Sequence, residues 1–178
     1  FFDQATVLVV DDTPDNLAVM SSLLKGSYKV RVANNGERAL RFARTEPRPD
    51  IILLDIMMPG MDGHEVCRRL KQDPVARAIP VIFVTGLSEV SDEEKGLEVG
   101  GVDYITKPVS PAIVKARVRT HLALYSYTRE LQKIVERRTE ELMQSRTAAA
   151  RMAGELDAAL RIQKGLLPDP RLIFNGED

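Results

Sequence analysis

Short apolar runs alternate with amphipathic segments over about the first 110 residues of the chain. The runs predict strands at about residues 5–10, 28–33, 50–55, 79–84 and 102–106. The run Ile51-Ile52-Leu53-Leu54 is apolar at every position, which is typical of a strand covered on both faces. Strands that alternate with helices in this way predict an α/β fold with a doubly wound, five-stranded parallel sheet.

The helices expected between these strands carry recognisable start signals. A capping residue followed by proline begins the first helix, and a serine with a glutamate three residues later forms a capping box for the fourth. The signals are, in chain order, Thr13-Pro14, Asn35, Gly63 and Ser91 with Glu94. The fourth helix is expected to end at Gly100-Gly101.

The pattern changes after Pro111. From there to about Leu167 the chain has no proline and only two glycines, and the strand pattern disappears. Apolar residues recur at alternating three- and four-residue offsets, at Leu124, Leu131, Val135, Leu142, Ala149, Met152, Leu156, Ala159 and Leu166. This spacing is typical of a coiled-coil seam, here interrupted by Thr128, Arg138, Ser145 and Gln163.

One helix over this stretch would have about 55 residues and be about 80 Å long. Such a helix cannot bury its apolar stripe against the small domain before it, so we expect a parallel homodimer through residues 124–167. The alternative is an amphipathic helix that folds back onto a domain outside this sequence. We therefore predict a domain at 1–123, a dimerisation and signalling linker at 124–167, and the truncated start of an output domain at 168–178.

The composition argues against several classes of protein. The chain has 25 Lys and Arg against 26 Asp and Glu, a net charge of -1, whereas nucleic-acid binders usually carry a basic excess. We find no signal peptide and no apolar run long enough to cross a bilayer. The single cysteine, Cys67, excludes an internal disulfide. We expect a trimmed, cytoplasmic protein with neither nucleic acid nor membrane as partner.

Carboxylates follow two of the buried strands. Asp11 and Asp12 follow Val7-Leu8-Val9-Val10, and Asp55 ends the third strand. Because parallel strands end at one edge of a sheet, these carboxylates should converge there. Two such charges 4 Å apart repel by roughly 4 kcal/mol at an effective dielectric constant of 20, so the cluster needs protons or a cation. Oxygen ligands of this kind suit Mg²⁺, although Asp11 or Asp12 alone would also serve as a helix cap.

Two further strand ends add a hydroxyl and an ammonium group. Thr85 ends the fourth strand, and Lys107 follows the fifth. Alone, either residue would usually be solvated. With the three carboxylates they form a set that binds a phosphoryl group while one carboxylate attacks phosphorus. His64 and His121 have no companions at ligand spacing, and we expect both at the surface.

These residues resemble the receiver domain of bacterial two-component response regulators. The resemblance covers about residues 5–123 and rests on Asp11-Asp12, the block from Leu53 to Gly63, Thr85, and Tyr104-Ile105-Thr106-Lys107-Pro108. It implies a flavodoxin-like sheet with strand order 2-1-3-4-5. It also implies that Asp55 accepts a phosphoryl group from a histidine kinase or phosphotransfer protein.

The resemblance also assigns supporting roles. Mg²⁺ would be held by Asp12, Asp55 and the backbone carbonyl of Met57, with Asp11 acting largely through water. Lys107 would bind a phosphoryl oxygen, and the Lys107-Pro108 bond would be cis. Thr85 and Tyr104 would form the switch pair that relays phosphorylation, although Tyr104 also fits a plain strand aromatic.

The output of such a receiver is expected beyond Asp178. The segment from Arg161 to Pro168 resembles the lead-in to metal-dependent serine/threonine phosphatase domains, so the full-length protein is expected to be a protein phosphatase. A cyclic-dinucleotide enzyme is the alternative. A stand-alone aspartyl-phosphate phosphohydrolase would usually have a second Asp where Met57 stands. A flavin carrier would need a hydroxyl-rich phosphate loop and ring-stacking aromatics, whereas the first loop here is acidic.

Overall fold

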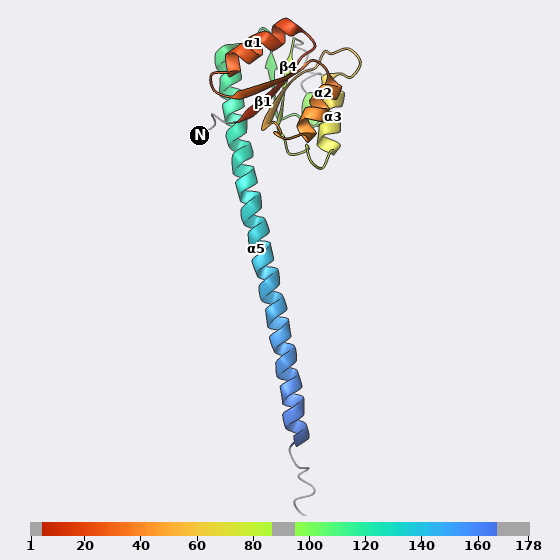
Figure 1. Ribbon diagram of the computed structural model, residues 1–178, viewed down its shortest axis with the longest axis vertical. Coiled ribbons are helices and arrows are strands. Elements are labelled where there is room, and N and C mark those ends of the chain that lie inside the picture. Colours follow the sequence, from red (N-terminus) through yellow and green to blue (C-terminus); the bar gives the residue numbers. More distant parts are fainter. Residues whose placement is uncertain (1–4, 87–94, 167–178) are drawn as a thin grey trace, which may run out of the picture. The chain divides into compact units, whose positions relative to one another are not determined.

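The computed structural model describes residues 5–86 and 95–166 (Figure 1). The chain divides into two units, Phe1–Thr128 and Arg129–Asp178. Within the described ranges, no helix combines the length and the apolar character needed to span a bilayer. The first unit contains the sheet, and the described part of the second unit is helical.

The sheet has five parallel strands in the order β2-β1-β3-β4-β5. The strands are β1 (Thr6–Val10), β2 (Lys29–Ala33), β3 (Ile51–Asp55), β4 (Val81–Thr85) and β5 (Asp103–Thr106). Every residue of β1, β3 and β4 is buried, as the continuous apolar runs predicted. The predicted fold class and strand order are therefore confirmed.

Helices cover both faces of this sheet, namely α1 (Pro14–Leu24), α2 (Gly36–Arg44), α3 (Gly63–Gln72) and the start of α5 (Pro111–Leu166). On one face, Met20 of α1 and Val114 of α5 share a core with Val9. On the other face, Ala39 of α2 and Val66 of α3 pack with Leu8 and Val10. Figure 1 shows α2 beside α3, away from α1. The chain is also helical at residues 95–98.

The helix starts agree with the predicted signals, with one difference. The side chain of Asn35 accepts a hydrogen bond from the backbone N–H of Arg38 at 2.8 Å and so caps α2. The Thr13 side chain makes no such bond at the start of α1. Instead the carboxylate of Asp11 accepts the Thr13 N–H at 2.9 Å. The capping box of Ser91 and Glu94 lies outside the described residues.

Helix α5 is continuous over 56 residues, close to the predicted 55. In its first turns Val114, Val118 and Leu122 are buried against the sheet. From residue 126 to residue 166 every residue is exposed in the single chain. Apolar seam residues such as Leu131 and Leu142 are 62% and 66% exposed. The predicted stripe is therefore present on the helix surface, and no described part of the chain covers it.

Candidate functional site

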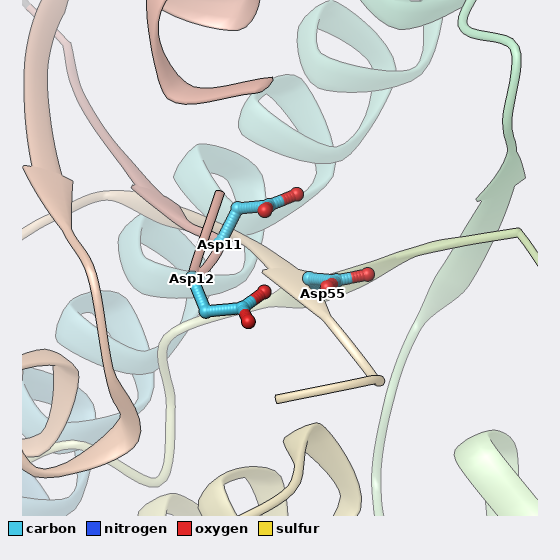
Figure 2. A group of neighbouring side chains, drawn as sticks. All are labelled: Asp11, Asp12 and Asp55. Atoms are coloured by element: carbon cyan, nitrogen blue, oxygen red, sulfur yellow. The ribbon is translucent and has the colours of Figure 1, made fainter. Parts of the chain in front are cut away.

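Three carboxylates meet at the end of β1 and β3, as predicted. These strands are neighbours, and Val10 of β1 lies opposite Leu54 of β3, so Asp11 comes level with Asp55. Each of Asp11, Asp12 and Asp55 offers a carboxylate oxygen, and these oxygens lie within 4.8 Å of one another. Figure 2 shows the three side chains at this edge of the sheet. We call these three residues the acidic cluster.

Lys107 lies against two members of the acidic cluster. Its Nζ is 2.9 Å from Asp11 Oδ2 and 3.1 Å from Asp55 Oδ1. Its backbone N–H donates to the carbonyl of Thr85 at 2.7 Å, which fixes the segment after β5 to the end of β4. The Lys107-Pro108 peptide bond is cis, as the resemblance implied. The structure therefore brings the predicted ammonium group to the predicted carboxylates.

Burial and neighbouring charges shift the pKa values of Asp55 and Lys107. Burial raises the pKa of Asp55, and the Asp11 and Asp12 carboxylates add to this, so that Lys107 only partly offsets the effect. Burial lowers the pKa of Lys107, but its hydrogen bonds to Asp11 and Asp55 outweigh burial and hold that pKa above its ordinary value. A divalent cation would favour the ionised form of Asp55, because it places positive charge beside a crowded carboxylate.

Asp11 also has a local role in its own loop. Its Oδ1 accepts the Thr13 N–H at 2.9 Å, which forms an Asx-type turn before α1 and does not cap an N–H group of the helix itself. The side-chain amide of Asn16 donates to Oδ1 at 3.1 Å and to Oδ2 at 3.0 Å. No spacing or motif in the sequence predicts this contact, since Asn16 looks like an ordinary residue in the first turns of a helix. Asp12, by contrast, is exposed.

The loop after Asp55 is shaped by close backbone contacts. The N–H groups of Met58 and Gly63 both donate to the Ile56 carbonyl, at 3.1 and 2.9 Å. A Cβ at Gly63 would lie 2.3 Å from the backbone oxygen of Asp55, so this position requires glycine. Met57 lies in this loop with 63% of its surface exposed. Its role as a carbonyl ligand stays a prediction.

Thr85 and Tyr104 border one small pocket. Phe83 of β4 lies opposite Tyr104 of β5, and Thr85 follows Phe83 by two residues, so these side chains share a face of the sheet. The pocket lining includes Ile56, Phe83, Thr85 and Tyr104. Thr85 is 1% exposed and Tyr104 is partly buried. The pair is brought together, and its role as a switch stays a prediction.

The two histidines, expected at the surface, are partly buried. The His64 ring packs 5.3 Å from the Phe83 ring, and its Nε2 is buried without a hydrogen-bond partner among the described residues. His121 Nε2 lies 2.9 Å from Asp103 Oδ2, and Arg117 also pairs with Asp103. Both contacts depend on helices packing onto the sheet, which residue spacing alone does not show.

The acidic cluster and Lys107 lie together at one edge of a flavodoxin-like sheet. Residues 7–119 match the response regulator receiver domain, and the chain belongs to this family. Receiver domains bind Mg²⁺ at their acidic site, and the matching carboxylates are present here.

Named relatives agree with this assignment. A probable cyclic di-GMP phosphodiesterase of Vibrio cholerae serotype O1 is 49% identical over 119 residues, which are 67% of this chain and 27% of that protein. Response regulator PleD of Caulobacter vibrioides is 47% identical over 117 residues, 65% of this chain and 26% of that protein. The chain thus spans about a quarter of the length of these relatives.

A solved structure adds information on the cation. The receiver domain of a sensor histidine kinase from Pseudomonas aeruginosa has a magnesium ion coordinated in its active-site cleft. It is 29% identical with a TM-score of 0.63, and the match covers 67% of this chain and 98% of that one.

Proposed function

We propose that Asp55 is the phosphoacceptor of this two-component receiver, with a histidine kinase or phosphotransfer protein as donor. The observation that carries the proposal is the position of Lys107 Nζ, within hydrogen-bonding distance of both Asp11 and Asp55. An ammonium group at this place binds a phosphoryl oxygen once Asp55 is modified. Asp12, Asp55 and the Met57 carbonyl would hold Mg²⁺, and Asp11 would act largely through water.

The reaction is a transfer between two side chains. An Asp55 oxygen attacks phosphorus, the bond from phosphorus to the donor's imidazole nitrogen breaks, and the imidazole takes up a proton. When bound, Mg²⁺ would neutralise negative charge on the phosphoryl oxygens. Lys107 exchanges its hydrogen bond with Asp55 for one with the phosphoryl group, while Asp11 keeps the ammonium group in place. The Thr85 hydroxyl donates a hydrogen bond to the same phosphoryl group.

The Thr85 and Tyr104 pair relays the modification. When the Thr85 hydroxyl moves toward the phosphoryl group, it leaves space in the pocket that it shares with Tyr104. The Tyr104 ring turns into this space, so that a local charge change biases an element with two arrangements. The common lining of the two side chains supports this proposal.

Replacement of the nucleophile tests the proposal. Wild-type protein should be labelled by radioactive acetyl phosphate only with Mg²⁺ present, and hydroxylamine should remove the label because it cleaves acyl phosphates. Asp55→Asn should abolish labelling. The matched control is Asp62→Asn in the same loop, since Asp62 caps α3 through the Glu65 N–H at 2.8 Å and asparagine caps equally well. Persistent labelling of the Asp55→Asn protein would refute the assignment.

We also propose that residues 124–167 pair two copies of the chain in parallel and pass the signal from the receiver at 1–123 to an output domain that begins at 168–178. The exposed apolar stripe of α5 supports the pairing. For the output, the segment from Arg161 to Pro168 favours a serine/threonine phosphatase. The Vibrio relative favours a cyclic-dinucleotide enzyme instead, although its match covers only 119 residues. The residues encoded after Asp178 discriminate between these outputs.

A further inference from the structure

Hydrogen-bond donors contact both carboxylate oxygens of Asp11. Its Oδ1 accepts hydrogen bonds from the Thr13 N–H and from the Asn16 amide, at 2.9 and 3.1 Å. Its Oδ2 accepts from the same Asn16 amide and from Lys107 Nζ, at 3.0 and 2.9 Å. Each Asp11 oxygen therefore has two donor contacts, and the single Asn16 nitrogen bridges the two oxygens. Asp11 is 4% exposed, and bulk water therefore adds little.

The Asn16 side-chain nitrogen contacts both Asp11 oxygens. Only its NH₂ group can face an ionised carboxylate, because the amide oxygen is an acceptor. Thr13 contributes a backbone group, and Lys107 is needed by the phosphoryl site. Asn16 is therefore the side chain that limits how Asp11 can meet a cation. While Thr13 and Lys107 keep their contacts, a cation that bonds directly to Asp11 displaces the Asn16 amide from at least one oxygen.

This limitation affects Mg²⁺ and Ca²⁺ differently. Mg²⁺ dehydrates reluctantly and keeps several waters, so it tolerates a carboxylate that acts through a water. Ca²⁺ takes six to eight oxygen ligands in flexible geometry and gains from each additional carboxylate that binds it directly. A carboxylate whose two oxygens already accept hydrogen bonds is therefore less available as the additional ligand that Ca²⁺ would use.

We infer that Asn16 is a positioning residue that sets the cation selectivity of the acidic cluster by keeping Asp11 from binding a cation directly. The inference rests on the proposed Mg²⁺ site. It assigns Asn16 a role in selectivity that is separate from the phosphoryl chemistry of Asp55. Removal of the amide frees one acceptor position on each Asp11 oxygen, and Ca²⁺ gains more from this change than Mg²⁺ does.

Calorimetric titration of the full chain with MgCl₂ and with CaCl₂ tests the inference without any phosphodonor. Asn16→Leu should raise the ratio of Ca²⁺ to Mg²⁺ affinity by about tenfold, the lower end of the effects seen when partners of metal ligands are removed. Asn16→Ala should give the same direction, and it replaces the leucine variant if that protein does not fold. Asn34→Leu is the matched control, because Asn34 follows the neighbouring strand β2 and its side-chain oxygen accepts from Asn35.

The outcomes separate this inference from the proposed function. If the variants change both affinities by the same factor, or neither, Asn16 does not set selectivity and the inference fails while the Mg²⁺ site stands. If the wild-type chain binds neither cation, the proposed metal site fails and the inference fails with it. A raised ratio in both Asn16 variants, with the Asn34 variant unchanged, supports the assignment.

Discussion

At the scale of single residues, the site depends as much on a missing side chain as on the charged ones. Gly63 begins α3 directly above the backbone of Asp55 and Ile56. A Cβ there would lie 2.3 Å from the Asp55 oxygen and 2.8 Å from the Ile56 Cα. Both are backbone atoms, which cannot turn away as a flexible side chain does. The backbone around the proposed nucleophile thus depends on glycine at this position.

We predict that Gly63→Ala lowers the free energy of unfolding by about 2 kcal/mol, within the range for overpacking, and slows labelling of Asp55 by acetyl phosphate. Urea unfolding measures the first effect and labelling rates the second. Gly26→Ala is the control, because a Cβ at Gly26 meets nothing within 4 Å. The free energy of unfolding of the Gly26→Ala protein should therefore be unchanged or raised. Equal stability of the two variants would show that the loop adapts to the methyl group.

Some site residues could be predicted from the sequence because chain direction alone places them. Parallel strands end at one edge, so Asp11, Asp55 and Lys107 were expected at the same edge of the sheet once the strands were recognised. Asn16 could not be predicted in this way. Its contact depends on the rotamer of one side chain early in α1, and no spacing in the sequence distinguishes it from a solvated helix residue.

At the scale of elements, an ion-pair cluster connects β5 to α5. Asp103 begins the strand that carries Tyr104, and it pairs with Arg117 and His121 of the helix. The Arg117 guanidinium also lies over the Tyr104 ring, 5.9 Å from its centroid. These contacts, together with the buried face of α5, attach the helix to the strand of the proposed switch. The sequence predicted both elements, but it did not show which of their side chains meet, because this depends on helix phase and tilt.

The Asp103 contacts should appear in the pH dependence of stability. Burial would raise the pKa of Asp103, but hydrogen bonds from Arg117 and His121 outweigh it and hold this pKa below its ordinary value. Because the folded-state pKa is lowered, the stabilisation is present above the unfolded-state pKa of about 3.9 and is lost as pH falls through the folded-state pKa. Asp103→Asn should therefore cost about 1–2 kcal/mol at pH 7 and less near pH 3.

Urea unfolding of wild type and Asp103→Asn at both pH values measures this difference. Asp157→Asn is the control, since the Asp157 carboxylate pairs with Arg161 on the helix surface and is 62% exposed. An exposed pair of this kind contributes little to stability at either pH. A constant difference between wild type and Asp103→Asn from pH 7 to pH 3 would contradict the proposed contribution of the ionised carboxylate.

At the scale of the whole molecule, a change at the acidic cluster matters only if it alters something beyond the receiver. The matched residues are 67% of this chain and 27% of the Vibrio relative, so most of that protein lies outside the shared part. Helix α5 carries two faces suited to such a link. Val118 and Leu122 are buried in the receiver, whereas Leu124 and Leu131 are 56% and 62% exposed and begin the seam. One helix can therefore pack on the receiver and pair with a second copy.

Adjacent residues of α5 provide a test of that pairing. Leu142 lies in the seam and Met143 beside it, and they are 66% and 67% exposed in the single chain. A parallel dimer buries Leu142 from both copies, worth about 3 kcal/mol or more, and leaves Met143 at its surface. In sedimentation equilibrium, Leu142→Glu should weaken dimerisation more than about a hundredfold in Kd, whereas Met143→Glu should leave it unchanged. Because exposure and added charge are matched, equal effects of the two substitutions would exclude the seam, and a monomeric wild type would exclude the dimer itself.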